Sequence, residues 1–219
     1  MVKKVVGRSS SLEIAFTIVF GALSVLLTLL KGFTTFPFPV LTYLKFEIAE
    51  IPCMVAYLAM GFKPGMASAI VYWLVLTPIG EFTPLGPAMK FAALASLILG
   101  MEAGRRLCGK NKSYMASVKT LSVSMVLGTI ARVIVMSVFN YLVLVVLFPE
   151  FLDLASMMLK AAGLNAGTPA NALITALTLT AVFNVIHSIL SVLLPYLIVK
   201  TIVRLHPGLF RRTHRPTTA

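Results

Sequence analysis

Charged residues are scarce in this chain of 219 residues, and acidic residues are the scarcest. Only 12% of the residues are charged, and 7 Asp and Glu stand against 19 Lys and Arg. Hydrophobic residues make up 58%, whereas soluble domains have about 45–50%. This composition excludes a disordered or fibrous chain and predicts an all-α integral membrane protein.

Residues that bind metals or perform catalysis are also few. The two cysteines, Cys53 and Cys108, lie far apart and form neither a disulfide framework nor a zinc motif. The sequence has no His-Glu-x-x-His motif and no Gly-x-Ser-x-Gly motif. Residues 104–111 resemble a P-loop, but Asn111 replaces the Ser or Thr that binds magnesium. We therefore expect no metal, no cofactor, no catalytic residue and no nucleotide site, and we do not expect an enzyme.

Long apolar runs are what the chain has in abundance. A spanning helix needs about 20 mostly apolar residues, and we predict six of them, the third being the least regular. A turn at Lys63-Pro64-Gly65 is expected to separate the second from the third. The six predicted spans are Leu12–Lys31, Glu47–Phe62, Met66–Pro78, Leu85–Leu107, Lys119–Phe148 and Ala172–Val203.

The basic residues predict the orientation of these helices. Cytoplasmic loops of membrane proteins are enriched in Lys and Arg, and the bias is consistent across every loop if both termini are cytoplasmic. The basic residues then on the cytoplasmic side are Lys3, Lys4, Arg8, Lys63, Arg105, Arg106, Lys110, Lys112, Lys119, Lys200, Arg204, Arg211, Arg212 and Arg215.

The chain is expected to form one membrane domain with a short extension. Residues 1–204 are predicted to form a single six-helix domain in the cell membrane, and residues 205–219 a basic cytoplasmic tail. We interpret the tail as a topology signal and an anchor to lipid headgroups, not as a nucleic-acid site. The less apolar segment 149–171 is predicted to be an external loop with a short amphipathic helix at 151–162.

Several polar residues interrupt the apolar runs near the predicted outer surface. Glu50 follows Glu47 by three residues on one helix face, and Asn184 precedes His187 by the same spacing. Asn140 lies near the outer end of the fifth run. A polar group inside a membrane is costly unless it is paired. These residues either join helices by hydrogen bonds or bind a planar, amide-rich ligand between aromatic walls.

Arg132 lies deep within the fifth run, where a guanidinium must be paired or face water. We expect a structural pairing with Glu50, with Glu102 or with backbone carbonyls. On the first run, small residues permit close helix packing or the docking of a membrane partner. The candidate partner-interface residues are Ala15, Gly21, Ala22 and Ser24.

Four segments together resemble the substrate-binding S-components of energy-coupling factor (ECF) transporters, most closely their riboflavin-specific branch. Tyr43–Pro52 looks like that branch's Tyr-Leu-x-x-Asp-Phe-Ser-Asp-x-Pro, and Gly61–Gly65 is similar to its Gly-Pro-x-x-Gly turn. Met136–Tyr141 looks like its Met-Ser-x-x-Asn-Tyr, and Phe183–Ile186 resembles the start of its Phe-Asn-x-Ile-Lys-Gly.

The resemblance implies a six-helix protein whose substrate pocket opens outward beneath the loop between the first two helices. It also implies a transmembrane coupling protein and two cytoplasmic ATPases as partners, which agrees with the absence of a P-loop here. Family site residues carry over at Asn140 and Asn184. The family's Lys-Asn, Asn-Phe and Lys-Gly pairs are replaced here by Tyr72-Trp73, Lys90-Phe91 and His187-Ser188.

We therefore predict a vitamin-binding S-component embedded in the lipid bilayer, with riboflavin as the favoured ligand. The alternatives are the same fold with another vitamin or a heterocyclic precursor, a self-sufficient membrane carrier or enzyme, and a structural scaffold. The residues predicted to bind the substrate are Tyr43, Phe46, Glu50, Tyr72, Trp73, Lys90, Asn140, Tyr141, Asn184 and His187.

Overall fold

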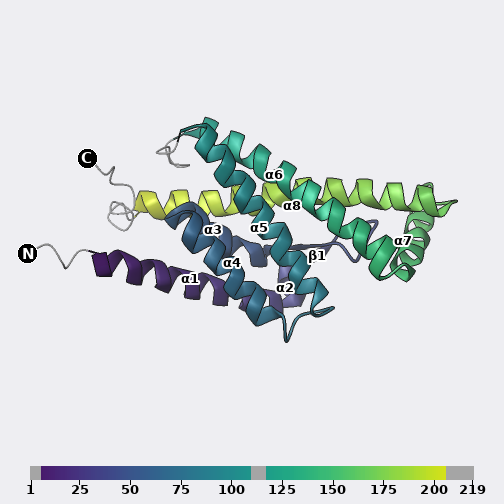
Figure 1. Ribbon diagram of the computed structural model, residues 1–219, viewed down its shortest axis with the longest axis horizontal. Helices are drawn as coiled ribbons and strands as arrows, with labels where there is room; N and C mark the ends of the chain where they lie inside the picture. The colour runs from purple at the N-terminus through teal and green to yellow at the C-terminus, as the bar shows by residue number, and fades with distance from the viewer. Residues whose placement is uncertain (1–5, 110–116, 206–219) are drawn as a thin grey trace, which may run out of the picture.

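The computed structural model describes residues 6–109 and 117–205, and it is built almost wholly of helices (Figure 1). The elements in chain order are α1 (Val6–Leu29), α2 (Lys31–Thr34), β1 (Thr35–Pro37), β2 (Lys45–Glu47), the 3₁₀ turn η1 (Ile48–Glu50), α3 (Ile51–Met60), α4 (Phe62–Leu76), α5 (Leu85–Leu107), α6 (Val118–Tyr141), the π-helical η2 (Leu142–Leu147), α7 (Glu150–Ala161) and α8 (Pro169–Leu205).

Most of the predicted runs appear as helices close to their expected bounds. Within the described residues, three helices are long and apolar enough to cross a membrane: α5, α6 with η2, and α8. Shorter apolar helices occupy 13–29, 48–60 and 62–76. The amphipathic helix expected at 151–162 is α7. The predicted basic tail lies outside the described residues, apart from Leu205.

The predicted turn at Lys63-Pro64-Gly65 is wrong, because these residues form the first turn of α4. The break lies at Gly61, whose φ of +98° is a left-handed conformation that favours glycine. Proline is tolerated in the first helical turn, where its missing N–H has no intrahelical partner. Pro64 therefore lies in the first turn of a helix here and does not mark the loop before it.

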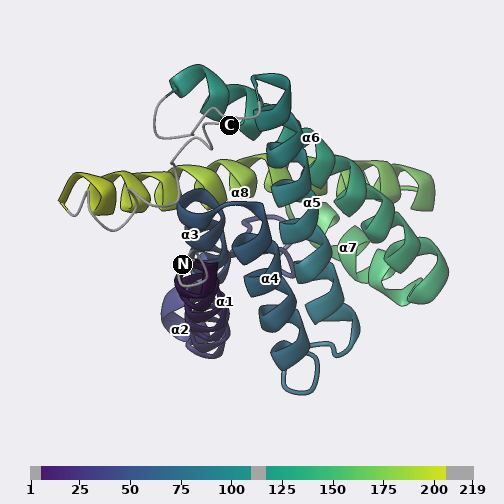
Figure 2. The same ribbon diagram turned by 60° about the vertical axis from the view of Figure 1, so that its left-hand side comes forward.

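In Figure 1, α1 and α8 follow the long axis of the molecule, whereas α4, α5 and α6 slant across it. The first residues of α1 and the last residues of α8 lie at the same end of the molecule (Figure 1). The connection between α4 and α5 and the short helix α7 lie toward the opposite end, and α1, α4 and α5 remain neighbours when the view is turned (Figure 2).

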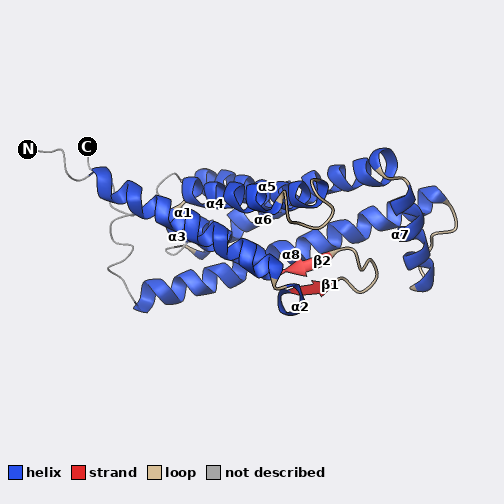
Figure 3. Ribbon diagram, turned by 90° about the horizontal axis from the view of Figure 1, so that it is seen from below, coloured by secondary structure: helices blue, strands red, loops and turns tan. Residues whose placement is uncertain are grey.

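A short antiparallel hairpin follows α2 and precedes α3 (Figure 3). β1 pairs with β2 so that Phe36 lies opposite Phe46 and Thr35 opposite Glu47. The connection 38–44 is closed by hydrogen bonds from Phe38 N to Leu44 O (2.7 Å) and from Leu44 N to Leu41 O (2.9 Å). This hairpin carries several of the predicted ligand residues toward α8.

The buried apolar side chains form two separate clusters. The first joins α1, α3, α4, α5 and α6 with the last third of α8, from Val192 to Val199. The second joins the 38–46 loop, η2 and α7 with the start of α8, from Ala172 to Phe183. The segment of α8 between the two clusters, residues 184–191, carries four buried polar side chains: Asn184, His187, Ser188 and Ser191.

Candidate functional site

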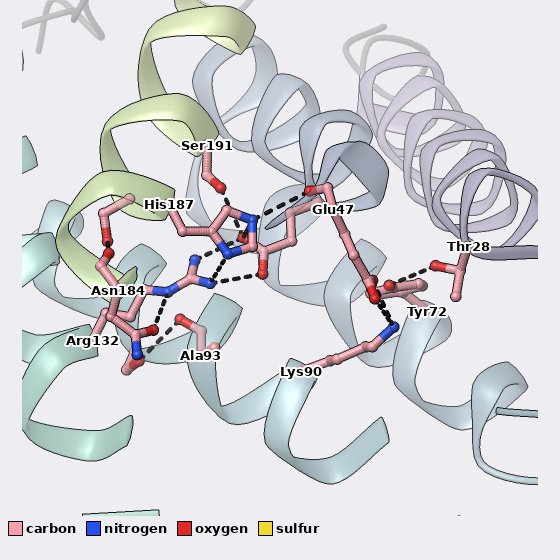
Figure 4. A network of polar contacts seen from close by, with 12 residues as sticks. Thr28, Glu47, Tyr72, Lys90, Ala93, Arg132, Asn184, His187 and Ser191 are labelled. Atoms are coloured by element: carbon pink, nitrogen blue, oxygen red, sulfur yellow. Dashed lines mark hydrogen bonds and ion pairs between the residues drawn. The ribbon is translucent and has the colours of Figure 1, made fainter. Parts of the chain in front are cut away.

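Arg132 is the centre of a buried polar network between the two clusters (Figure 4). Its side chain is only 2% exposed. It donates to Glu50 twice, from Nη1 to Oε2 at 2.7 Å and from Nη2 to Oε1 at 3.0 Å. A bidentate pair of this kind is strong and directional. Of the partners expected for Arg132, the structure selects Glu50, because Glu102 instead accepts hydrogen bonds from Arg105 and Arg106.

The network extends from Arg132 to α8. Arg132 Nε donates to Asn184 Oδ1 at 3.1 Å, and Nη2 lies 3.0 Å from His187 Nδ1. Ser191 Oγ donates to Glu50 Oε2 at 2.8 Å. Three segments far apart in sequence meet here, since Glu50 precedes α3, Arg132 belongs to α6 and the other residues to α8. Three predicted site residues, Glu50, Asn184 and His187, are thereby brought together.

The hairpin joins the same network through β2. His187 Nε2 lies 3.2 Å from the backbone oxygen of Glu47. The Glu47 carboxylate accepts from Lys90 Nζ on α5, with Oε1 at 2.7 Å and Oε2 at 2.5 Å. Lys45 forms a second, more exposed ion pair with Glu81 at 3.2 Å. The second half of the hairpin is therefore tied to both α5 and α8.

Aromatic rings cover the network on the side of the second cluster. The Phe46 ring lies 4.7 Å from the Phe183 ring and 5.7 Å from the His187 ring, centroid to centroid. Phe38 meets both Phe46 and Phe183 edge-on, at 6.1 and 5.9 Å. The hairpin thus places Phe38 and Phe46 against α8 and fills the space beside its polar segment.

Two buried hydroxyl groups in this region have no hydrogen-bond partner among the described residues, Thr180 Oγ1 and Tyr43 Oη. Burial also raises the pKa of Tyr43, in the loop between the strands, to about 12, so its phenol stays neutral. Asn140 on α6 is buried, and within the described part of the chain its side chain makes one hydrogen bond, from Nδ2 to Met136 O at 2.8 Å. Buried polar groups are normally satisfied, so these groups have unused capacity for a ligand.

The other predicted ligand residues lie apart from Asn184 and His187. Tyr72 is buried and its Oη lies 2.7 Å from Thr28 Oγ1. The Trp73 ring stacks on Phe91 with 4.9 Å between centroids. Tyr141 is 45% exposed on the surface of α6. These three aromatic residues do not form walls around the Arg132 network.

A cavity of about 280 Å³ lies on the other side of the hairpin, between α1, α4 and α5. Lys45, Glu47, Glu81 and Lys90 contribute its charged lining. Of the predicted ligand residues, only Lys90 lines this cavity, and Asn140, Asn184 and His187 do not.

The residues predicted for a partner interface divide between two faces of α1. Gly21 and Ser24 face the interior: a Cβ at Gly21 would lie 2.9 Å from Val71, and Ser24 Oγ lies 3.2 Å from Cys53 Sγ. Ala15 and Ala22 are exposed. The last two are the ones that an outside partner can reach.

Sequence reasoning did not include Arg132, Thr180, Phe183 or Ser191 among the ligand residues. A signal for the α8 residues was present, because Thr180, Asn184, His187 and Ser191 recur at intervals of three and four and share one helix face. Arg132 is conspicuous in its apolar run, but its contacts with Asn184 and His187 had no local signal, since these partners lie 52 and 55 residues away in the chain.

Comparisons with known proteins agree with this architecture. Residues 13–199 match the family model described as ECF transporter, substrate-specific component. The chain is 34% identical to the riboflavin transporter FmnP of Bacillus subtilis (strain 168) over 158 residues, 69% of this chain and 79% of that protein. It is 31% identical to the riboflavin transporter RibU of Staphylococcus aureus (strain TCH60) over 138 residues, 63% and 67% of the two chains.

A solved structure of the S component of a bacterial ECF transporter has the same fold. The match covers 90% of this chain and 98% of that one, with a TM-score of 0.66 and 23% sequence identity. The family is one of transporters and not of enzymes. From the family match and the helical architecture, we conclude that this chain belongs to the substrate-specific components of ECF transporters and is a multi-pass membrane protein.

Proposed function

We propose that this chain captures riboflavin outside the cell and passes it on for uptake driven by ATP hydrolysis in partner subunits. Support for the ligand comes from the two riboflavin transporters to which the chain is 31% and 34% identical. Further support comes from the motifs around Glu50, Asn140 and Asn184, which resemble those of the riboflavin-specific branch.

The observation that supports this binding site is that buried polar groups near the second cluster lack hydrogen-bond partners. Thr180 Oγ1 and Tyr43 Oη are buried without partners among the described residues, and Asn140 Oδ1 accepts no hydrogen bond from them. Leaving a buried polar group unpaired costs about 1–3 kcal/mol. A ligand that offers both donors and acceptors removes this cost on binding, as a heterocycle with a polyhydroxyl side chain does.

The aromatic rings of the hairpin occupy the place that we assign to the ligand. The centroids of the Phe46 and Phe183 rings lie 4.7 Å apart in this conformation, which is the distance of two aromatic rings in contact. A flat ring system in the place of Phe46 would contact Phe183 in the same way. We infer that the loop at 38–46 moves outward, that the ligand replaces Phe46 against Phe183, and that the loop then closes over it. In this proposal, the predicted contacts Tyr43, Phe46, Asn140, Asn184 and His187 touch the ligand. Tyr72, Trp73 and Tyr141 do not, and Lys90 acts through Glu47.

The arrangement in the membrane forms part of the proposal. We assign six spans to α1, α3, α4, α5, α6 with η2, and α8, within one domain that extends through residue 204. Both ends of the chain then lie on the cytoplasmic side, with the basic connection between α5 and α6. The proposed partners are a transmembrane coupling protein and two cytoplasmic ATPases, and Ala15 and Ala22 on α1 are the proposed contacts with the coupling protein.

The test is a titration of purified protein in detergent, with riboflavin fluorescence as the signal. Replacing both Asn140 and Asn184 by Ala removes two hydrogen bonds worth about 1 kcal/mol each, so the Kd should rise more than tenfold. Asn165→Ala, at an exposed position after α7, is the matched control and should leave the Kd unchanged.

Three results would overturn parts of this proposal. A wild-type Kd for riboflavin in the micromolar range or weaker would exclude riboflavin, and mass spectrometry of co-purified small molecules would then identify the vitamin or precursor. If Lys90→Ala abolishes binding and the Asn140 and Asn184 double variant does not, the ligand binds in the cavity beside Glu47. Riboflavin accumulation in liposomes that contain this chain alone would favour a self-sufficient carrier.

A further inference from the structure

Arg132 determines the hydrogen-bonding state of the two α8 residues that it contacts. A guanidinium carries only donors. Because Arg132 Nη2 lies 3.0 Å from His187 Nδ1, that nitrogen must be the acceptor. The imidazole is then neutral, its proton is on Nε2, and Nε2 donates to the backbone oxygen of Glu47 at 3.2 Å. Both nitrogens of His187 are occupied in this state.

The same reasoning fixes the amide of Asn184. Arg132 Nε can only donate, so the amide atom 3.1 Å from it is the oxygen. The amide nitrogen donates one hydrogen to Thr180 O at 2.9 Å. One N–H of Asn184 is left for a ligand, and it lies on the same helix face as the free hydroxyl of Thr180.

The charges around this site cancel in pairs. The ion pairs are Arg132 with Glu50 and Lys90 with Glu47. His187 is neutral because its Nδ1 accepts from Arg132, and Ser191 donates to the Glu50 carboxylate without adding charge. Among the described residues, a ligand held here therefore meets hydrogen-bonding groups and cations that are already paired with carboxylates. A phosphate group, with a charge of about −1.5 to −2 at neutral pH, would lose its hydration without gaining a counter-charge.

We propose that Arg132 is a positioning residue that holds Asn184 and His187 in one donor and acceptor state, and that its pairing with Glu50 makes the site select an uncharged ligand over its phosphorylated form. The motif that this segment resembles has a lysine where this chain has His187, and the cation that contacts His187 here is Arg132 of α6. The location of the ligand in this inference rests on the proposed function.

The first experiment compares the Kd of riboflavin with that of riboflavin 5′-phosphate for wild type and matched variants. Wild type should prefer riboflavin at least tenfold. Glu50→Gln leaves the guanidinium charge unpaired, so the preference should shift at least tenfold toward the phosphate. The double variant Arg132→Gln with Glu50→Gln removes both charges and should reverse that shift.

A further variant separates positioning from charge. Arg132→Lys keeps the charge opposite Glu50 but lacks the planar fork that reaches three partners. Both ligands should bind it at least tenfold more weakly, with the preference for riboflavin unchanged. Equal affinity of wild type for the two ligands, or the same preference in wild type and Glu50→Gln, would overturn the charge argument.

The second experiment needs no ligand and so stands apart from the choice of riboflavin. Proton–nitrogen correlation spectra of the ¹⁵N-labelled protein report the tautomer of each of the 3 histidines, and His187→Gln assigns the signal of His187. At about pH 7, we expect the neutral form protonated at Nε2 in wild type and its loss in Arg132→Gln. A His187 that is doubly protonated or protonated only at Nδ1 in wild type overturns the positioning role, even if riboflavin binds. The expected spectra without riboflavin binding overturn only the proposed ligand.

Discussion

Some buried polar residues of this protein have hydrogen-bond partners within the chain, and others do not. Glu50 and Arg132 satisfy each other, although removing either one would leave a buried charge. Thr180, by contrast, is fully buried, and its hydroxyl has no hydrogen-bond partner among the described residues. Such a hydroxyl lowers the stability of the ligand-free protein, and a polar ligand would compensate for it.

Replacing Thr180 by Val, which has nearly the same shape, tests this difference. Removing an unpaired buried hydroxyl should stabilise the ligand-free protein by about 1 kcal/mol, seen as a higher Tm. The same change should weaken riboflavin binding about fivefold to tenfold, because the ligand loses one partner. Thermal unfolding in detergent and fluorescence titration provide the two measurements.

Thr120 offers a matched control for this substitution. Its hydroxyl is also buried without a partner among the described residues, but it lies in the first turn of α6, next to the first cluster and not the second. Thr120→Val should raise the Tm by a similar amount and leave the Kd unchanged. If Thr180→Val instead lowers the Tm, or leaves riboflavin affinity intact, Thr180 is not a ligand contact.

At the scale of helices and strands, glycines allow α5 and α6 to pack closely against each other. A Cβ added at Gly104 would lie 2.5 Å from Ser124 Cα, and one at Gly100 would lie 2.6 Å from Leu127 O. A Cβ added at Gly128 would lie 2.9 Å from Leu97 O. Small residues allow the backbones of membrane helices to approach in this way.

Gly104→Ala should therefore destabilise the protein, although Ala is the better helix former. The added methyl meets backbone atoms that cannot move independently, and overpacking of this kind costs about 1–3 kcal/mol. Gly167→Ala is the control, because its Cβ would approach only Asn165 Oδ1, at 3.9 Å. A Tm for Gly104→Ala equal to that of wild type would show that the two helices can separate freely.

The elements differ in how far sequence could predict them. The bounds of α5 follow directly from an uninterrupted apolar run, and Leu85–Leu107 is where the helix lies. The hairpin was not predicted, because strands of three residues are too short to show an alternating pattern. The turn was placed at Pro64 and not at Gly61, because proline marks both loops and first helical turns.

The candidate site was predictable only in part for a related reason. Asn140, Asn184 and Glu50 were found because a polar residue in an apolar run is conspicuous. The geometry of Asn184 and Glu50 depends on contacts with Arg132 across 52 and 82 residues, and no local pattern encodes which of several carboxylates Arg132 will meet. Whether Phe46 or a ligand occupies the space beside Phe183 is likewise decided by tertiary packing.

For the whole molecule, the proposed topology makes a prediction about labelling. Native Cys108 ends α5 next to the basic connection, and Asn165 lies beyond α7 at the other end. In intact cells, a membrane-impermeant maleimide should label a cysteine introduced by Asn165→Cys and should not label Cys108. Cys108 should react once the membrane is opened, whereas Cys53 is buried and should react only after unfolding.

The reverse pattern would contradict the orientation. Labelling of Cys108 from outside, with Asn165→Cys protected, would place the ends of the chain outside the cell and the hairpin within it. The riboflavin site would then face the cytoplasm. A Cys108→Ser background carrying Asn165→Cys assigns each signal to one residue.

The single helix α8 contributes to both apolar clusters and to the polar segment between them. Its 37 residues extend for about 55 Å at the usual helical rise. One helix therefore connects the proposed ligand site with the far end of the protein. We expect a ligand that tilts α8 at Phe183 to shift the opposite end of the helix as well, with Pro195 as the position where the helix can bend.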